Sequence, residues 1–152
     1  MKGEYRIPIT ADLNGVPNTG VLTMTVKGNK ASNGSFEQSS GGSTPDSWTP
    51  SGSTSYEGQS ASAGSGGSWT SAPVAVTPGA SYDLAVTAAG SPGTVLVQQL
   101  SGVDALLGSV SLPAVGAVSS VLTVVPGATQ VRIVLKGGLT GTTFDDVGLF
   151  DH

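Results

Sequence analysis

The chain has 152 residues, no cysteine and a formal net charge of −4. This length suits one domain with a buried core, and the missing cysteine excludes a disulfide framework. Charged residues are scarce, glycine is abundant, and Val and Leu supply most large apolar side chains, a mixture that favours short strands and tight turns over helices. No apolar run is long enough to span a membrane, and no apolar stretch follows Lys2 and Arg6 as a secretory signal requires.

Residues 1–30 predict a strand-rich arm ahead of the main body of the chain. Apolar residues alternate with other residues in 5–9 and again in 21–26, while residues 13–18 are typical of a turn. We therefore expect a hairpin here, which is either an extra pair of strands for the body or an attachment device.

Charge is unevenly divided between this arm and the rest of the chain. The arm carries a balance of +2 and residues 31–152 a balance of −6, with no basic residue between Lys30 and Arg132. An acidic, lysine-poor body repels phosphate backbones, so nucleic acid is not an expected partner. Two interpretations of the asymmetry stay open: it serves solubility, or the basic arm contacts the acidic body of another copy.

Two short segments at opposite ends of the body have a similar pattern. Residues 32–38 and 144–150 each place an acid beside an aromatic residue, and each predicts a short strand. Between them, residues 38–71 are dense in Ser, Gly and Thr, which is typical of a flexible linker. Three aromatic residues in this stretch argue against disorder, so we expect long loops with one or two short strands. These residues are Trp48, Tyr56 and Trp69.

From residue 72 onward the pattern predicts strands alone. No stretch has apolar spacing of three and four long enough for a helix. The same Val-x-Pro-Gly-Ala sequence occurs at residues 76–80 and, as Val-Val-Pro-Gly-Ala, at 124–128, and each copy predicts a β-turn before a strand. The expected strands are 74–76, 82–87, 94–100, 106–112, 118–125, 131–136 and 143–150.

The residues needed for catalysis are scarce. His152 is the only histidine and is terminal, so a Ser-His-acid triad and a zinc site are both unsupported. Asp145 and Asp146 are adjacent, so on a regular strand their side chains point to opposite faces and cannot form a glycosidase pair by themselves. Other acids could combine with one of them, but solvated carboxylates or metal ligands explain them better. We predict that the chain is not an enzyme.

The paired segments 32–38 and 144–150, together with the Pro-Gly turn before Tyr82, make residues 31–151 resemble a jelly-roll carbohydrate-binding module with a galactose-binding-like fold. Phage virion accessory proteins also use such domains. The resemblance implies an all-β jelly-roll β-sandwich over residues 31–152, preceded by the N-terminal arm. It also implies that the first and last strands lie side by side.

The resemblance further implies a structural calcium ion held by Glu37 and an aspartate of the last strand, with backbone oxygens near Asn33 completing the shell. Alternation places Asp145 on the core side with Val147, and Asp146 on the other side. The family pattern favours the second acid, so we select Asp146, while Asp145 and an unfilled site remain alternatives.

Sugar binding requires aromatic platforms beside hydrogen-bonding groups. Tyr56 and Trp69 are the candidate platforms, with packing in the core or at its rim as the alternative for each, and Glu57 and Gln59 are the adjacent polar groups. Trp48 is expected to pack against the sandwich instead. Four other aromatic residues are expected to be structural: Phe36, Tyr82, Phe144 and Phe150.

Two hypotheses about function follow. The first is a non-catalytic structural or binding module displayed on a larger assembly at the virion surface, such as a phage capsid decoration or tail accessory protein. In this hypothesis the arm binds other copies or a capsid or tail protein, and the displayed body has a further role in binding polysaccharide. The alternative is an extracellular carbohydrate-binding module of a secreted polysaccharide-degrading enzyme.

Overall fold

The computed structural model describes the backbone of residues 3–13 and 16–152 and the side chains from residue 27 onward. This part of the chain contains strands and no helix, so it holds no helix able to cross a membrane. The all-β jelly-roll with a strand-rich arm that the sequence predicts is confirmed.

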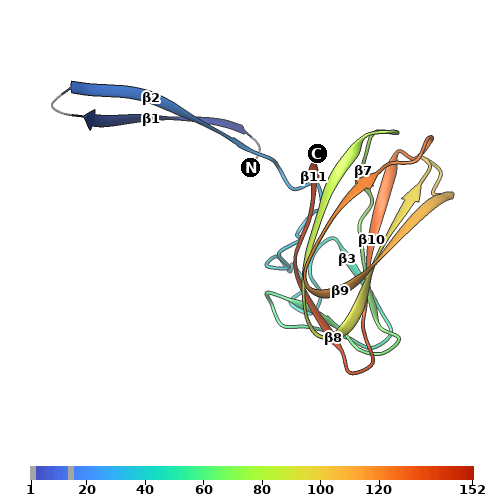
Figure 1. Ribbon diagram of the computed structural model, residues 1–152. Coiled ribbons are helices and arrows are strands. Elements are labelled where there is room, and N and C mark those ends of the chain that lie inside the picture. Colours follow the sequence, from blue (N-terminus) through green and yellow to red (C-terminus); the bar gives the residue numbers. More distant parts are fainter. Residues whose placement is uncertain (1–2, 14–15) are drawn as a thin grey trace.

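Two long strands organise the body. β8 (Ser81–Leu100) pairs with β9 (Leu106–Thr123) along nearly its whole length. On its other side, the first half of β8 pairs with β11 (Thr142–Asp151), and the second half pairs with β10 (Gln130–Lys136). Each long strand therefore belongs to both layers of the sandwich (Figure 1).

Short strands complete the two layers. In one layer, β11 is followed by β5 (Ala61–Ala63) and then by β4 (Thr54–Tyr56). In the other layer, β10 pairs with β6 (Ser68–Ser71), which pairs with β3 (Trp48–Ser51), and β7 (Val74–Ala75) also pairs with β10.

The sequence pattern divides each long strand in two, because a Gly- and Pro-containing stretch interrupts each alternation. The structure instead carries the strands through these bends, with a register shift between Ala88 and Gly93. Gly90 has φ 92° and Gly116 has φ 62°, a region that glycine enters at little cost. A Cβ at Gly90 would lie 2.8 Å from the carbonyl oxygen of Gly141, so the bend also brings two backbones close together.

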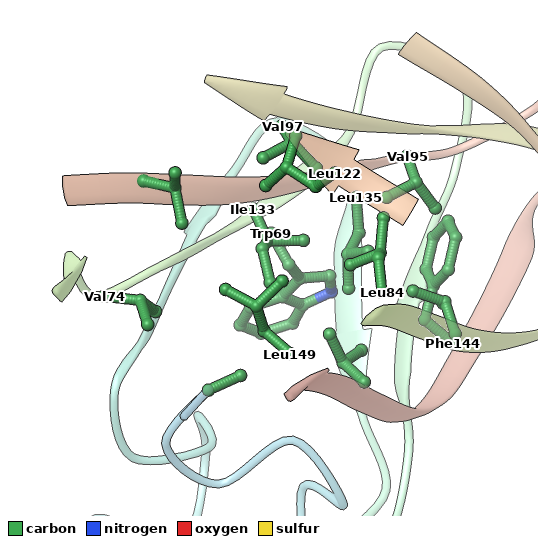
Figure 2. Packing of buried hydrophobic residues seen from close by; sticks show 14 of the residues in the cluster. Trp69, Val74, Leu84, Val95, Val97, Leu122, Ile133, Leu135, Phe144 and Leu149 are labelled. Atoms are coloured by element: carbon green, nitrogen blue, oxygen red, sulfur yellow. The ribbon is translucent and has the colours of Figure 1, made fainter. Parts of the chain in front are cut away.

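The core lies between the two layers. Figure 2 shows Trp69 among side chains of both layers, including Leu84, Leu149 and Ile133. Full burial of a leucine or isoleucine side chain stabilises the fold by roughly 1.5–3 kcal/mol.

The two Pro-Gly turns lie side by side at one edge of this core. The amide of Gly79 donates to the carbonyl of Val124, and the amide of Val124 donates to the carbonyl of Ala80, each at 2.9 Å. The repeated sequence motif thus forms a pair of adjoining turns.

The arm is a separate two-stranded sheet. β1 (Gly3–Leu13) and β2 (Val16–Val26) pair in antiparallel register from Gly3 opposite Val26 to Leu13 opposite Val16. Both strands extend into the expected turn, and the two residues between them lie outside the described part of the chain. Within that part, neither strand pairs with the body, and the ribbon projects away from the sandwich (Figure 1).

The expected strand over residues 32–38 is wrong. These residues form turns and bends, with Asn33 at φ 49° and Phe36 at φ 55°. Two such residues so close together turn the backbone out of the extended conformation of a strand. The segment nevertheless lies against β11, as the resemblance implied.

Candidate functional site

Loop 29–38 is held on the backbone of β11. The amide of Lys30 donates to the carbonyl of Leu149 at 2.8 Å, and the amide of Val147 donates to the carbonyl of Gly34 at 2.9 Å. The side chain of Asn29 adds two bonds, donating to the Val147 carbonyl and accepting from the Leu149 amide, both at 2.9 Å. A Cβ at Gly34 would lie 1.8 Å from the Val147 carbonyl oxygen, so only glycine permits this approach.

The side chain of Asn33 fixes the shape of the loop. Its Oδ1 accepts from the amide of Gln38 at 3.0 Å, and its Nδ2 donates to the carbonyls of Gln38 and Asp46 at 2.8 and 2.9 Å. Trp48 donates its indole N–H to the Asn33 carbonyl at 3.1 Å, and its ring packs against Phe36 with centroids 5.0 Å apart. Trp48 is 5% exposed, which confirms its expected packing role.

A β-bulge changes the orientation of the two aspartates in β11. The register shifts between Asp145 and Gly148, and Asp146 has φ 48°. Because the bulge adds one residue, Phe144 and Val147 are both buried in the core, while Asp145 lies opposite Thr87 on the outer face. The expectation that Asp145 shares the side of Val147 is therefore wrong.

The bulge and loop 29–38 gather carboxylates at one end of the body. Burial raises the pKa of Asp145 above its ordinary value, and the like charges of Asp146 and Glu37 raise it further, against the hydrogen bond from the Asp146 amide. The turn after β4, which carries Glu57, lies nearby because Tyr56 donates its hydroxyl to the carbonyl of the loop residue Phe36 at 2.7 Å.

These residues provide only part of a calcium shell. Glu37 and Asp146 are exposed, and their carboxylates have no hydrogen-bond partner among the described residues, so these oxygens are free for a hard cation. The described residues hold no group of three or more His, Cys, Asp or Glu suited to a metal. The carbonyl of Asn33 already accepts from Phe36 and Trp48, so other backbone carbonyls or water would have to supply the remaining oxygens. Calcium therefore stays a prediction.

Trp69 does not fit the role of a sugar platform. It is 1% exposed and donates its indole N–H to the Ser62 carbonyl at 2.9 Å. On β6 its register partner is Leu135 of β10, which is fully buried, so Trp69 packs in the core and its prediction as a sugar platform is wrong.

Tyr56, Glu57 and Gln59 lie at the acidic end of the body. Tyr56 is half-buried, and its hydroxyl is already bonded to Phe36. Glu57 and Gln59 are exposed, and their side chains have no partner within the described ranges. These two groups are therefore available to a ligand, while only part of the Tyr56 ring is accessible.

A hollow of about 350 Å³ lies between loop 29–38 and the bulge of β11. Sequence reasoning treated Phe150 as structural, but it is half-buried and lines this hollow. No signal in the sequence marks the hollow, because the bulge and the loop turns create it. Its lining residues are Asn29, Ala31, Asn33, Gly34, Ser35, Gln38, Asp146, Val147, Gly148 and Phe150.

The C-terminal histidine is held near the root of the arm. His152 Nδ1 lies 2.6 Å from Asp83 Oδ1, and Lys27 lies 3.4 Å from the other oxygen of Asp83. Lys30 lies 3.3 Å from Asp151. The His152 hydrogen bond is the main cause that lowers the pKa of Asp83, and the Lys27 charge adds to it. Asp83 is the only side-chain partner of His152 in the described chain, so no catalytic triad is assembled there.

No protein-family model matches the sequence, and no curated protein matches it. Solved structures do match. The enzymatically active domain of tailspike protein 4 from bacteriophage CBA120 superposes with a TM-score of 0.63 and 18% identity, over 82% of this chain and 21% of that one. The chain thus spans about a fifth of the length of that domain.

Two matches cover nearly the whole of the other chain. A family 4 carbohydrate-binding module has a TM-score of 0.55 and 16% identity over 80% of this chain and 99% of that one. The N-terminal cellulose-binding domain of β-1,4-glucanase C from Cellulomonas fimi has a TM-score of 0.51 and 21% identity, over 82% and 98%. The chain therefore has the jelly-roll fold of carbohydrate-binding modules.

Proposed function

We propose that the protein is a non-catalytic structural and binding module, displayed on a larger assembly through its N-terminal hairpin. A phage capsid decoration or tail accessory protein at the virion surface is the form that we favour. The observation that carries this proposal is the hairpin itself, which is hydrogen-bonded to no strand of the body in the described chain.

An isolated two-stranded hairpin is marginally stable in water, so this one needs a partner surface. The register places Tyr5 opposite Met24 and Ile7 opposite Leu22, which puts these positions on one face of the ribbon. Among the described residues no strand of the body pairs with the hairpin, and its ribbon projects away from the sandwich (Figure 1). We infer that another copy or a shell protein covers it in the assembly.

The hairpin docks through apolar contacts rather than through net charge. The excess of basic residues in the arm depends on Lys27 and Lys30, and both form ion pairs with the body of the same chain, at Asp83 and Asp151. Residues 1–26 alone have a formal charge of zero. The net charge of the hairpin is therefore too small to steer it toward an acidic neighbour.

The first prediction is that removing residues 1–26 leaves a folded body that no longer assembles. The cut preserves Asn29 and Lys30, which bond to β11. Circular dichroism should show an intact body, and light scattering should show fewer copies per particle than for the full chain. Ile7→Asp should act like the deletion, and Thr23→Asp, at a position on the opposite face, should not. An unchanged number of copies per particle in the truncated chain would contradict the attachment role.

A second candidate is a carbohydrate-binding module of a secreted polysaccharide-degrading enzyme. Its support is the match over nearly the full length of two such modules. Glycan binding by the body is common to both candidates, and Tyr56, Glu57 and Gln59 remain candidate contacts. Gene neighbours distinguish the two: capsid and tail genes favour the first, and glycoside hydrolase genes favour the second. Release of reducing sugar from any polysaccharide would contradict both.

A further inference from the structure

The side chains around the hollow beside β11 fall into two groups. Asn29 and Asn33 use their amide groups to hold the loop, as described above. The hydroxyl of Ser35, the carboxamide of Gln38 and the carboxylate of Asp146 have no hydrogen-bond partner in the described chain. Three polar groups that the fold does not use thus line one cavity.

An aromatic ring forms part of the same lining. A Cβ built on Gly148 would lie 2.3 Å from Cε2 and 2.6 Å from Cζ of Phe150, so the ring edge rests directly on the glycine backbone. Gly148 is buried, while Phe150 is half-buried. The glycine thereby holds the ring in place while part of the ring remains accessible.

The charge around the hollow selects among ligands. Asp146 lies in it, and Asp145 and Glu37 are close enough to each other for their charges to interact. The structure gives these acids no basic partner in the described chain. A phosphate, a sulfate or a uronic acid would be repelled at this site, whereas neutral hydroxyl groups can donate to the carboxylate.

The size of the hollow limits the ligand further. Its volume of about 350 Å³ lies near the lower limit of ligand pockets, which run from roughly 300 to 1,000 Å³. A single ring suits such a volume better than an extended chain.

We propose that this hollow binds one neutral sugar unit. The Phe150 ring covers its apolar C–H face, the Asp146 carboxylate accepts from its hydroxyls, and the Gln38 carboxamide both donates and accepts. The proposal rests on the glycan-binding role of the body and assigns that role to residues other than Tyr56, Glu57 and Gln59.

The test uses the full chain, labelled with ¹⁵N and titrated with the methyl β-glycosides of glucose, galactose, mannose and xylose at millimolar concentrations. EDTA is present throughout, so that metal binding by Asp146 cannot contribute. We expect one of the four glycosides to shift the amide resonances of Gln38, Gly148 and Phe150 in a saturable way.

Three variants test the assignment. Phe150→Leu keeps apolar volume but loses the flat ring. Gln38→Ala removes the carboxamide and Asp146→Asn removes the negative charge, and neither group bonds to another side chain or backbone group in the described chain. Asparagine tolerates the positive φ at position 146, so this variant should fold normally. Each variant should bind about tenfold more weakly or worse. Ser32→Ala, at an exposed position of the same loop outside the lining of the hollow, should bind as the parent does.

The outcomes separate this inference from the proposed function. Saturable shifts confined to the amides of Tyr56, Glu57 and Gln59 would overturn the hollow as the site and leave glycan binding intact. Parent-like affinity in Asp146→Asn and Gln38→Ala would also overturn it. No shift with any glycoside would overturn the single-sugar site, while binding of a longer polysaccharide by the same sample would retain the glycan role. The hairpin deletion tests the attachment role independently.

Discussion

Single residues determine how the loop and the last strand meet. The Asn29 side chain bonds loop 29–38 to β11, and the Asn33 side chain bonds within the loop and to Asp46, so the loop can turn and still remain on β11. Gly34 permits the closest approach of the two backbones. Net contributions of about 1 kcal/mol for each hydrogen bond make this cluster a substantial part of the stability at this end.

Gly34→Ala should therefore destabilise the protein strongly. The added methyl would lie 1.8 Å from the Val147 carbonyl oxygen, so the loop must move away from β11 and lose bonds there. We expect a loss of about 3 kcal/mol in unfolding free energy, measured by urea denaturation. Gly41→Ala is the matched control, because nothing lies within 4 Å of a Cβ at that position. Equal effects of the two substitutions would contradict the proposed contact.

Asp145→Asn should raise stability slightly at neutral pH. Burial raises the folded-state pKa of Asp145, so the folded state binds its proton more tightly than the unfolded state does. The charged form then opposes folding above the folded-state pKa, and this penalty disappears as pH falls below the ordinary value of 3.8. Asparagine keeps the acceptor for the Asp146 amide.

Thermal melts at neutral pH and well below 3.8 measure this difference. Asp145→Asn should melt at a higher temperature than the parent at neutral pH and at the same temperature as the parent at the lower pH. Glu57→Gln should change neither, because Glu57 is exposed and has no partner in the described chain. A lower melting temperature for Asp145→Asn at neutral pH would show that its carboxylate stabilises the fold.

At the scale of elements, alternation identified most of the strands but not where they bend. Tyr82, Leu84 and Val86 are buried in β8 as their spacing predicts. The bulge in β11 reversed the expected side of Asp145, because a two-residue period carries no mark of one inserted residue. Trp69 has only Ser and Thr as close neighbours, so no apolar alternation could indicate the face on which it lies.

The candidate site was predictable only in part. The resemblance drawn from the sequence placed residues 32–38 beside the last strand, and the loop does lie on β11. The hollow could not be foreseen, since it depends on positive φ at Asn33 and Asp146 and on an aromatic ring resting on Gly148. These features arise from tertiary contacts that local patterns do not contain.

Calcium should raise the melting temperature if Glu37 and Asp146 bind it, because a ligand that binds only the folded state stabilises that state. At a hundredfold excess over Kd the gain is about 2.7 kcal/mol. Melts in calcium and in EDTA measure it, and Glu37→Ala should abolish the difference while Glu57→Ala should not. Identical melts of the parent in both solutions would reject the site.

At the scale of the whole molecule, the root of the hairpin and the C-terminus lie together (Figure 1). Lys27 and His152 share Asp83, and Lys30 pairs with Asp151. The hairpin thus leaves the sandwich at a point where ion pairs involve both the first and the last residues of the body. An assembly that binds the hairpin would present the rest of the sandwich outward on a short, anchored root.

The length of β8 and β9 has a mechanical consequence. Each strand forms part of both layers, so the two layers are joined by continuous backbone as well as by the core. A pulling force applied at the hairpin root would therefore be transmitted to both layers together and would not separate one layer from the other. For a domain tethered by one end to a large particle, this shared backbone gives resistance to shear without a disulfide.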